Sequence, residues 1–270
     1  MTMLLVGCGK MGSAMLEGWL DQGTHPSKIT IVEPNTDAAN DFVARLGVKA
    51  VASADELPAN YAPDVVVLAV KPQIMDQVVA PYAKLTKHGP VFLSIAAGRT
   101  IASFETLLGT DAAIVRAMPN TPASIGRGIT VGCPNANVTD TQADLCKNLL
   151  KAVGDVEWVT DESLMDAVTA LSGSGPAYIF LLAEAMSHAG QQAGLAPDLA
   201  ARLARATVAG SGELLNQSLL PAATLRENVT SPNGTTAAAL DVLMADGGLT
   251  DVMTKAILAA TKRSIELAKS

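Results

Sequence analysis

The chain has 270 residues, of which 49% are hydrophobic, 17% charged and 3% aromatic, and its formal net charge is −7. This composition is typical of a globular protein, and the length suffices for one large domain or two smaller ones. The negative charge and the lack of any Lys/Arg cluster argue against a nucleic-acid partner, because binding to such a backbone depends on cationic contacts to phosphates. No segment reaches the roughly 18 uninterrupted apolar residues of a membrane-spanning helix, so we expect no membrane partner either.

The cysteines indicate a reducing environment. Cys8, Cys133 and Cys146 are odd in number and widely spaced, which matches neither a disulfide framework nor a zinc site. The apolar run at the N-terminus is too short for a signal peptide, and no basic region precedes it. We therefore expect a soluble cytoplasmic protein without a metal.

In the first part of the chain, short apolar runs alternate with polar segments that favour helices. The strand candidates are Met3–Gly7, Ile29–Val32, Asp64–Val70, Val91–Ala96 and Ala113–Met118. The helix candidates are Met11–Leu20, Thr36–Leu46, Gln73–Lys87 and Ile101–Leu108. Near-continuous apolar strands that alternate with helices are typical of a parallel sheet covered on both faces. The pattern predicts an α/β domain with a doubly wound parallel sheet over residues 1–160.

The remaining part of the chain contains only helix-like patterns. The expected helices are Ser163–Leu171, Pro176–Gly194, Pro197–Asn216, Leu219–Val229, Thr235–Ala245 and Leu249–Lys269. Several begin at Pro, Ser, Thr or Asp and end at Gly. Many are rich in Ala and apolar on more than one face, which indicates burial against another chain as well as within the domain, although a single compact bundle would also fit. We predict an all-helical second domain over residues 161–270.

A glycine-rich turn directly follows the first strand candidate and opens the first helix. It has the pattern G-x-G-x-x-G, which permits a tight turn, close approach of a pyrophosphate and close packing of helix on strand. Anionic phosphates are also favoured at a helix N-terminus. The turn predicts a Rossmann-type dinucleotide site, with a turn that only packs as the alternative. The candidate residues are Gly7, Cys8, Gly9, Lys10, Met11 and Gly12.

Glu33 ends the second strand candidate, about twenty residues after the glycine turn, which is where the adenosine ribose binds in this type of domain. A carboxylate accepts hydrogen bonds from ribose hydroxyls and repels a 2′-phosphate. No Arg follows in the stretch EPNTD to bind such a phosphate. The cofactor is therefore NADPH or NADH, and Glu33 favours NADH.

Three more stretches lie at the carboxyl ends of strand candidates, where open α/β sheets bind ligands. Lys71 could contact phosphate or ribose, or could be a solvated lysine at a strand end. Asn120 could offer its amide to the nicotinamide, or could be a packed turn residue. The candidate cofactor-binding residues in these stretches are Ala69, Val70, Lys71, Pro72, Ile95, Ala96, Ala97 and Asn120.

Two segments of the helical part place several small polar residues before a helix. In LSGSGPAY, from Leu171 to Tyr178, two glycines and two serines precede Pro176, although a cap needs only one serine. In ENVTSPNGTTAAAL, from Glu227 to Leu240, hydroxyls and backbone N–H groups gather at a helix start. Such groups could bind an anion or could simply cap the helix.

Six motifs occur together in one order, and with them the chain resembles pyrroline-5-carboxylate reductase over essentially its whole length. The motifs are GCGKMG, AVKPQ, SIAAG, RAMPNTP, LSGSGPAY and NVTSPNGTTAAAL. The resemblance implies hydride transfer from NAD(P)H to the C=N carbon of 1-pyrroline-5-carboxylate, which gives L-proline in the last step of proline biosynthesis. It also implies a homodimer with interlocked helical domains, which could assemble further into a decamer.

The resemblance also assigns roles within the last motif. The substrate is expected between the nicotinamide of one chain and this loop, commonly that of the partner chain. Its carboxylate would bind at the helix N-terminus, to the free N–H groups of Gly234 and Thr235 and the hydroxyl of Ser231. Thr236 would contact the ring nitrogen and would be the catalytic residue. The implied substrate-binding residues are Ser231, Gly234, Thr235 and Thr236, and Asn228 is implied as a cofactor-binding residue.

Two features depart from the pattern of the family. Asn233 stands where many members have glycine, and Asn tolerates a left-handed backbone. Glu33 stands where many members carry small or basic groups for the 2′-phosphate, which puts the usual preference for NADPH in question.

Two alternative functions fit parts of the sequence. A β-hydroxyacid dehydrogenase or another imine reductase would share the glycine turn and a helical second domain, but hydroxyacid enzymes use a lysine on a second-domain helix, and residues 176–216 contain no lysine. A non-enzymatic NADH-binding sensor would show cofactor binding without turnover.

Overall fold

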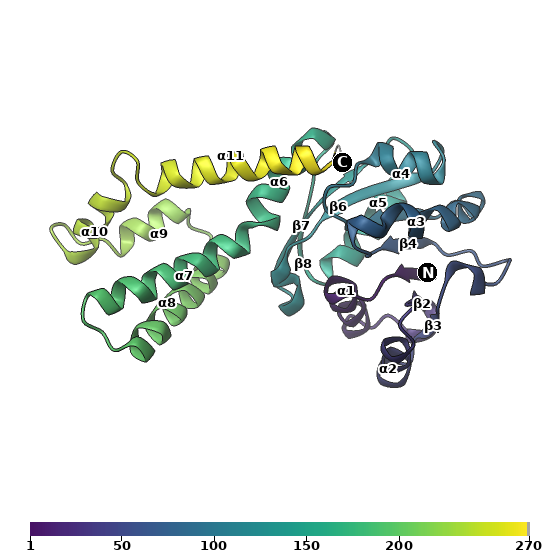
Figure 1. Ribbon diagram of the computed structural model, residues 1–270, viewed down its shortest axis with the longest axis horizontal. Helices are drawn as coiled ribbons and strands as arrows, with labels where there is room; N and C mark the ends of the chain where they lie inside the picture. Colours follow the sequence, from purple (N-terminus) through teal and green to yellow (C-terminus); the bar gives the residue numbers. More distant parts are fainter. Residues whose placement is uncertain (269–270) are drawn as a thin grey trace. The chain divides into compact units, whose positions relative to one another are not determined.

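The computed structural model describes residues 1–268 and divides the chain into two compact units. The first unit comprises Met1–Gly173 together with the chain from Thr261 onward, and the second comprises Ser174–Ala260. Figure 1 shows the chain coloured along its sequence. The predicted boundary at residue 160 lies just after the last strand, whereas the division between the compact units falls at Gly173.

The first unit contains one eight-stranded sheet with the order β3-β2-β1-β4-β5-β6-β7-β8. Neighbouring strands are parallel except β6 and β7, which are antiparallel. The strands are β1 (Met3–Val6), β2 (Ile29–Val32), β3 (Lys49–Val51), β4 (Val65–Leu68), β5 (Val91–Ser94), β6 (Ala113–Met118), β7 (Gly128–Pro134) and β8 (Gly154–Trp158). The five strands expected from the sequence are present, and the Rossmann-type α/β fold class is confirmed.

The strands β3, β7 and β8 were not predicted. Strand β3 has only three residues, none of them buried. Strand β7 reads GITVGCP, and its two glycines and proline are residues that strands usually lack. Strand β8 reads GDVEW and places acidic residues at alternate, exposed positions. These strands form because they pair with neighbouring strands, β3 and β8 at the two edges of the sheet and β7 between β6 and β8, which a local sequence pattern does not reveal.

Helices cover both faces of the sheet. Within the first unit they are α1 (Lys10–Asp21), α2 (Thr36–Leu46), α3 (Met75–Val79), α4 (Ile101–Leu108), α5 (Asp140–Lys151) and α6 (Met165–Val168). Helix α5 was not predicted, although Thr139 and Gln142 form a capping box at its start. The single helix expected over Gln73–Lys87 is α3 flanked by the 3₁₀ segments η3 (Pro72–Ile74) and η4 (Ala80–His88). Pro81, which lacks a backbone N–H, falls where α3 gives way to η4.

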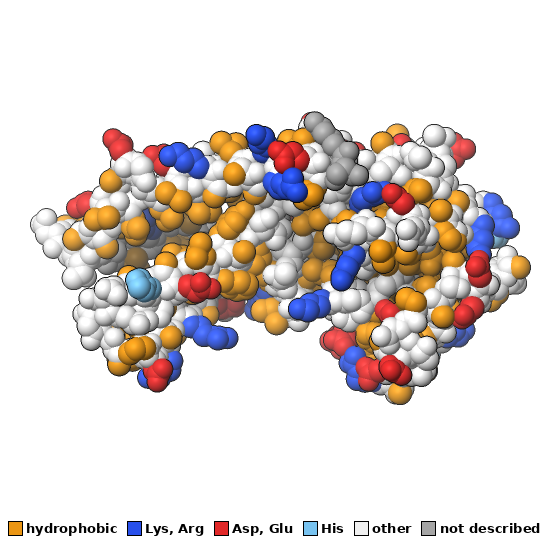
Figure 2. Space-filling model, in the orientation of Figure 1, with side chains coloured by type: hydrophobic (Ala, Val, Ile, Leu, Met, Phe, Trp, Pro, Cys, Tyr) orange, Lys and Arg blue, Asp and Glu red, His pale blue; other side chains and the backbone are white. Residues whose placement is uncertain are grey.

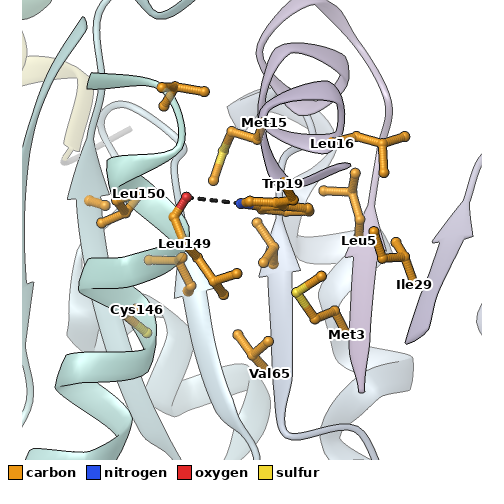
Figure 3. Packing of buried hydrophobic residues seen from close by; sticks show 14 of the residues in the cluster. Met3, Leu5, Met15, Leu16, Trp19, Ile29, Val65, Cys146, Leu149 and Leu150 are labelled. Carbon is orange, nitrogen blue, oxygen red and sulfur yellow. Dashed lines mark hydrogen bonds between the residues drawn. The ribbon is translucent and has the colours of Figure 1, made fainter. Parts of the chain in front are cut away.

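The core lies in two layers because successive strand residues point to opposite faces. Met3 and Leu5 of β1 belong to the layer under α1, α2 and α5, whereas Leu4 and Val6 belong to the layer under α3, η4 and α4. In the first layer Trp19 is fully buried, and its indole N–H donates to the carbonyl of Leu149 over 2.9 Å (Figure 3). This bond joins α1 to the end of α5.

The second unit is helical, as predicted. Its elements are α7 (Gly175–Gln192), α8 (Pro197–Gln217), α9 (Ala222–Asn228), α10 (Thr235–Leu243) and most of α11 (Leu249–Ala268). Lys269, the expected end of the last helix, lies outside the described residues. Among the residues that the structure describes, α7, α9 and α10 contain no buried position.

Large apolar side chains of these helices are instead exposed, such as Phe180 with 64% and Val242 with 72% of its surface accessible. Figure 2 shows apolar side chains recurring along this part of the chain. Exposed apolar area of this extent marks an interaction surface. None of the described helices is long and apolar enough to cross a membrane.

Candidate functional site

A cavity of about 640 Å³ opens at the carboxyl ends of β1, β2 and β4, and we call it the cofactor pocket. This edge of a parallel sheet is where open α/β folds bind ligands. The cofactor pocket is lined by Val6, Gly7, Cys8, Gly9, Val32, Glu33, Pro34, Ala52, Ser53, Ala54, Asp55, Ala69, Val70, Lys71, Ile74, Gln77, Val78, Pro81 and Tyr82.

The glycine turn fits a bound pyrophosphate. Gly7 has a positive φ of 90°, and an added Cβ would lie 2.7 Å from Val70 Cγ1. At Gly12 a Cβ would lie 2.4 Å from the carbonyl oxygen of Gly7, so this glycine allows α1 to pack on the turn. At Gly9, by contrast, a Cβ would meet no atom within 4 Å. Gly9 therefore leaves open space at the pocket wall, which is what close approach of a phosphate requires.

The N-terminus of α1 is free to bind an anion. Gly9 is its N-cap and provides no side-chain cap, and no acidic residue lies in the first turn. The unpaired N–H groups and the helix dipole therefore favour negative charge at this point. Lys10, Met11 and Gly12 form this first turn, as the sequence predicted.

Glu33 lines the cofactor pocket and also stabilises the glycine turn. One of its carboxylate oxygens, Oε2, accepts from the backbone N–H of Cys8 at 3.2 Å, and the other, Oε1, accepts from that of Asn35 at 3.0 Å. A carboxylate offers about four lone-pair sites, so two stay available for ribose hydroxyls. Burial and the nearby Glu33 carboxylate raise the pKa of the Cys8 thiol to about 12, and this thiol is therefore protonated and unreactive at neutral pH.

The structure separates the other predicted cofactor residues into two groups. Ala69, Val70 and Lys71 line the cofactor pocket, and Pro72 follows them as the first residue of η3. The stretch Ile95–Ala97 follows β5 and is absent from the lining of this pocket within the described residues. Asn120 uses its amide oxygen to accept from the backbone N–H of Ile129 at 3.0 Å, which ties the end of β6 to β7.

Several lining residues were missed in the sequence. The stretch Ala52–Asp55 follows the unpredicted β3, and Pro81 and Tyr82 belong to η4. Recognition of the short run KAV at Lys49–Val51 as a strand would have pointed to Ala52–Asp55, because parallel strands end at the same edge.

The expected substrate segment lies in the second unit, at the start of α10. Gly234 is the N-cap and supplies no side-chain cap. Its own N–H, expected to be free, donates to the carbonyl of Ser231 at 3.0 Å. The first intrahelical acceptor is the Gly234 carbonyl, which binds the N–H of Ala238 at 3.2 Å. The N–H groups of Thr235 and Thr236 therefore remain as donors at the helix start.

The geometry of this loop depends on Asn233, the only described non-glycine residue with a positive φ, at 59°. The left-handed backbone expected for this asparagine is thus present. Thr236 is half-buried, and within the described residues no hydrogen bond engages its hydroxyl. Asn228, the expected cofactor residue, is the exposed last residue of α9.

Comparison with known proteins gives matches along the whole chain. Residues 162–267 match the family model described as pyrroline-5-carboxylate reductase dimerisation, and residues 2–98 match that described as NADP oxidoreductase coenzyme F420-dependent. The chain is 40% identical to pyrroline-5-carboxylate reductase of Pseudomonas aeruginosa over 98% of its own length and 96% of that protein.

Among the solved structures similar to this chain, two pyrroline-5-carboxylate reductases match it along nearly its whole length. A pyrroline-5-carboxylate reductase from Coxiella burnetii superimposes with a TM-score of 0.93 at 36% identity, covering 100% of this chain and 99% of that one. The Plasmodium falciparum pyrroline carboxylate reductase with NADP bound gives a TM-score of 0.81 at 29% identity, covering 99% and 98% of the two chains. The fold, the glycine turn and these full-length matches agree, and the chain belongs to the pyrroline-5-carboxylate reductase family of NAD(P)-dependent oxidoreductases.

Proposed function

We propose that this protein reduces 1-pyrroline-5-carboxylate to L-proline, with a reduced nicotinamide dinucleotide bound in the cofactor pocket. The observation that carries the proposal is the uncapped N-terminus of α10, in a chain that belongs to this family along its whole length. Neither a hydroxyacid dehydrogenase nor a sensor is favoured by the full-length matches.

The start of α10 matches the two polar groups of the substrate. The free N–H groups of Thr235 and Thr236, together with the helix dipole, favour the substrate carboxylate. The exposed hydroxyl of Ser231 can donate a further hydrogen bond to this carboxylate, and Gly234 keeps the approach open because it has no side chain. A single anion site would thus fix one end of the substrate ring.

Thr236 is placed to act on the ring nitrogen. The residue is half-buried and its hydroxyl lacks a partner among the described residues, so this hydroxyl can hydrogen-bond to the nitrogen of the C=N bond. When bound, the reduced nicotinamide supplies the hydride that adds to the imine carbon. The ring nitrogen gains one proton from solvent water in the same reaction, and Thr236 orients this nitrogen and relays that proton through its hydroxyl. Most of the catalytic effect then comes from orientation.

Replacement of Thr236 tests this role. Thr236→Val keeps the branched shape but removes the hydroxyl, and we expect kcat/KM to fall about 10- to 100-fold, as for a lost hydrogen bond to a charged group. Thr236→Ser retains the hydroxyl and is the matched control, for which most of the activity should remain. The measurement is the substrate-dependent loss of nicotinamide absorbance. Unchanged kcat/KM in Thr236→Val would contradict the assignment.

We also propose that the protein prefers NADH to NADPH. The Glu33 carboxylate has two lone-pair sites left for ribose hydroxyls, and its charge opposes a 2′-phosphate. Lys71 also lines the pocket and could attract that phosphate, but among the described residues no other Lys or Arg lines the pocket.

The cofactor preference can be tested by removing the charge of Glu33. Glu33→Gln keeps one of the two oxygens that accept from the backbone N–H groups of Cys8 and Asn35 and removes the charge, so the ratio of kcat/KM for NADPH to that for NADH should rise about tenfold. Glu33→Arg should raise it further. If the wild-type protein uses NADPH better, or if Glu33→Gln leaves the ratio unchanged, the preference is set elsewhere.

The proposal includes an oligomeric, cytoplasmic enzyme. The exposed apolar helices of the second unit match the dimerisation model and support a homodimer with interlocked helical domains, which could build a decamer. The three cysteines are unpaired and buried, which supports a reducing cytoplasm. Sedimentation equilibrium would give the number of chains, and a monomer at micromolar concentration would refute the dimer.

A further inference from the structure

One wall of the cofactor pocket is built from an irregular segment. Residues 72–88, which we call the wall segment, comprise η3, α3 and η4, and only the five residues of α3 are α-helical. A helix this short is unstable by itself, and the hydrogen bonds of 3₁₀ segments have poorer geometry than those of an α-helix. None of these three elements has a side-chain cap at its start. The wall segment therefore depends on contacts with other parts of the chain to keep its shape.

Packing against the core fixes only the inner side of α3. Met75 and Val79 are fully buried and belong to the layer of the core that lies under α3, η4 and α4. Farther along the wall segment, the Lys84 ammonium donates to the Ala54 carbonyl at 3.0 Å. The outer side of α3 carries Asp76, whose side chain is 63% exposed. The contact that Asp76 makes therefore decides how firmly this outer side is held.

Asp76 pairs with Arg99, which lies in the loop between β5 and α4. The Arg99 guanidinium donates through Nη2 to Asp76 Oδ1. The Arg99 side chain is only 22% exposed, so solvent screens this pair less than a pair of two exposed side chains. Among the described residues, Arg99 Nε is the only buried side-chain nitrogen or oxygen without a hydrogen-bond partner. Loss of Asp76 would therefore leave a largely buried cation without its partner.

The loop that carries Arg99 has a defined backbone on both sides of this residue. Gly98 has a φ of 72° and forms a left-handed turn directly before Arg99. Thr100, directly after it, caps α4 by accepting from the N–H of Ser103 at 3.2 Å. The ion pair thus connects a well-fixed loop to the weakly structured wall segment.

We propose that Arg99 and Asp76 are positioning residues, whose ion pair holds the wall segment in the conformation that binds the dinucleotide. The inference rests on the proposed function, since it assumes that a dinucleotide occupies the cofactor pocket. Neither residue is among the described residues that line this pocket, whereas Gln77 and Val78, which follow Asp76 in α3, both line it. A pocket whose binding conformation is populated only part of the time binds its ligand more weakly by that fraction. Breaking the pair therefore weakens binding without removing a contact to the ligand.

The test is calorimetric binding of NADH to the wild type, to Arg99→Met, to Asp76→Asn and to the variant with both changes. Arg99→Met keeps an unbranched apolar stem and removes the charge. Each single change should raise the Kd for NADH about three- to fivefold, near the upper limit for an ion pair that is partly exposed. The double variant should bind no more weakly than the single variants, because the second change removes a group that is already unpaired.

Glu17→Gln is the matched control. It breaks the 2.7 Å ion pair between Glu17 and Arg45, which joins α1 to α2, and neither residue is among the described residues that line the pocket. This variant should keep the wild-type Kd for NADH.

Amide hydrogen exchange distinguishes positioning from a general loss of stability. In Arg99→Met without ligand, the amides of residues 75–79 should exchange faster than in the wild type, while those of β5 should keep the wild-type rate. Saturating NADH should restore wild-type protection to residues 75–79, because the ligand selects the binding conformation. Faster exchange throughout the sheet, or unchanged exchange of residues 75–79, would overturn the positioning role.

The binding results also separate this inference from the proposed function. If the wild type does not bind NADH, the proposed cofactor pocket is wrong and the inference falls with it. If the wild type binds NADH but both single variants keep its Kd, the pair has no positioning role, while the proposed function stands. The same conclusion follows if the two single effects simply add in the double variant.

Discussion

Replacing Gly9 by alanine should separate the folding of the glycine turn from its ability to bind a dinucleotide. The backbone of Gly9 has φ −65° and ψ −172°, which alanine adopts without strain, and the added Cβ would meet no atom within 4 Å. Loss of backbone freedom in the unfolded chain stabilises the variant, while alanine is a poorer N-cap than glycine, so the net change should stay within about 1 kcal/mol. The methyl group nevertheless occupies the space that a pyrophosphate needs. We expect an unchanged melting temperature, to within about 4 °C, and a loss of NADH affinity of about tenfold or more.

Gly12→Ala is the matched comparison, because its added Cβ would clash within the protein. That Cβ would lie 2.4 Å from the carbonyl oxygen of Gly7 and 3.3 Å from Ala69 Cβ. Overpacking of this kind costs about 1–3 kcal/mol, which for a domain of this size lowers the melting temperature by about 2–12 °C. Thermal unfolding and calorimetric titration with NADH should be measured on both variants. The reasoning is refuted if Gly9→Ala binds NADH with wild-type affinity, or if it unfolds as early as Gly12→Ala.

Three further predictions concern the stability of the first unit. Trp19→Phe removes the indole N–H donor and leaves a smaller buried ring, so urea denaturation should show a free energy of unfolding lower by about 2–4 kcal/mol. A decrease below about 1 kcal/mol would contradict the importance of the hydrogen bond to Leu149. Glu162→Gln breaks the pair with the buried Arg116, whose Nη1 lies 2.8 Å from Glu162 Oε1, and should cost about 2–3 kcal/mol. The exposed ion pair between Arg263 and Glu266 is the control, since Glu266→Gln should cost less than about 1 kcal/mol. Equal losses of stability in Glu162→Gln and Glu266→Gln would argue against a role for burial. Burial raises the pKa of the Cys146 thiol from 9.0 to about 12; the unfolded chain therefore releases this proton first, and the free energy of unfolding should fall as the pH rises from 9 toward 12, less steeply in Cys146→Ala.

Local pattern accounts for what could be predicted about the fold. Five apolar strands and the glycine turn are each encoded by consecutive residues, since a buried parallel strand needs a short apolar run and a tight turn needs glycine. Where the fold depends on pairing between distant segments, prediction failed. Strand β8 (Gly154–Trp158) forms only because β7 lies beside it, and the long helix expected after Pro72 is divided at Pro81.

The candidate site divides in the same way. The sequence by itself determined the glycine turn after β1, the acidic residue Glu33 at the end of β2 and the helix start at Thr235, because each is set by a local run of residues. Only the tertiary structure decided that the Glu33 carboxylate binds the Cys8 N–H, and that Asp55 joins the same pocket. These contacts form because β1, β2 and β3 lie side by side in the sheet, which brings the segments that follow them together. No single segment of the sequence encodes that arrangement.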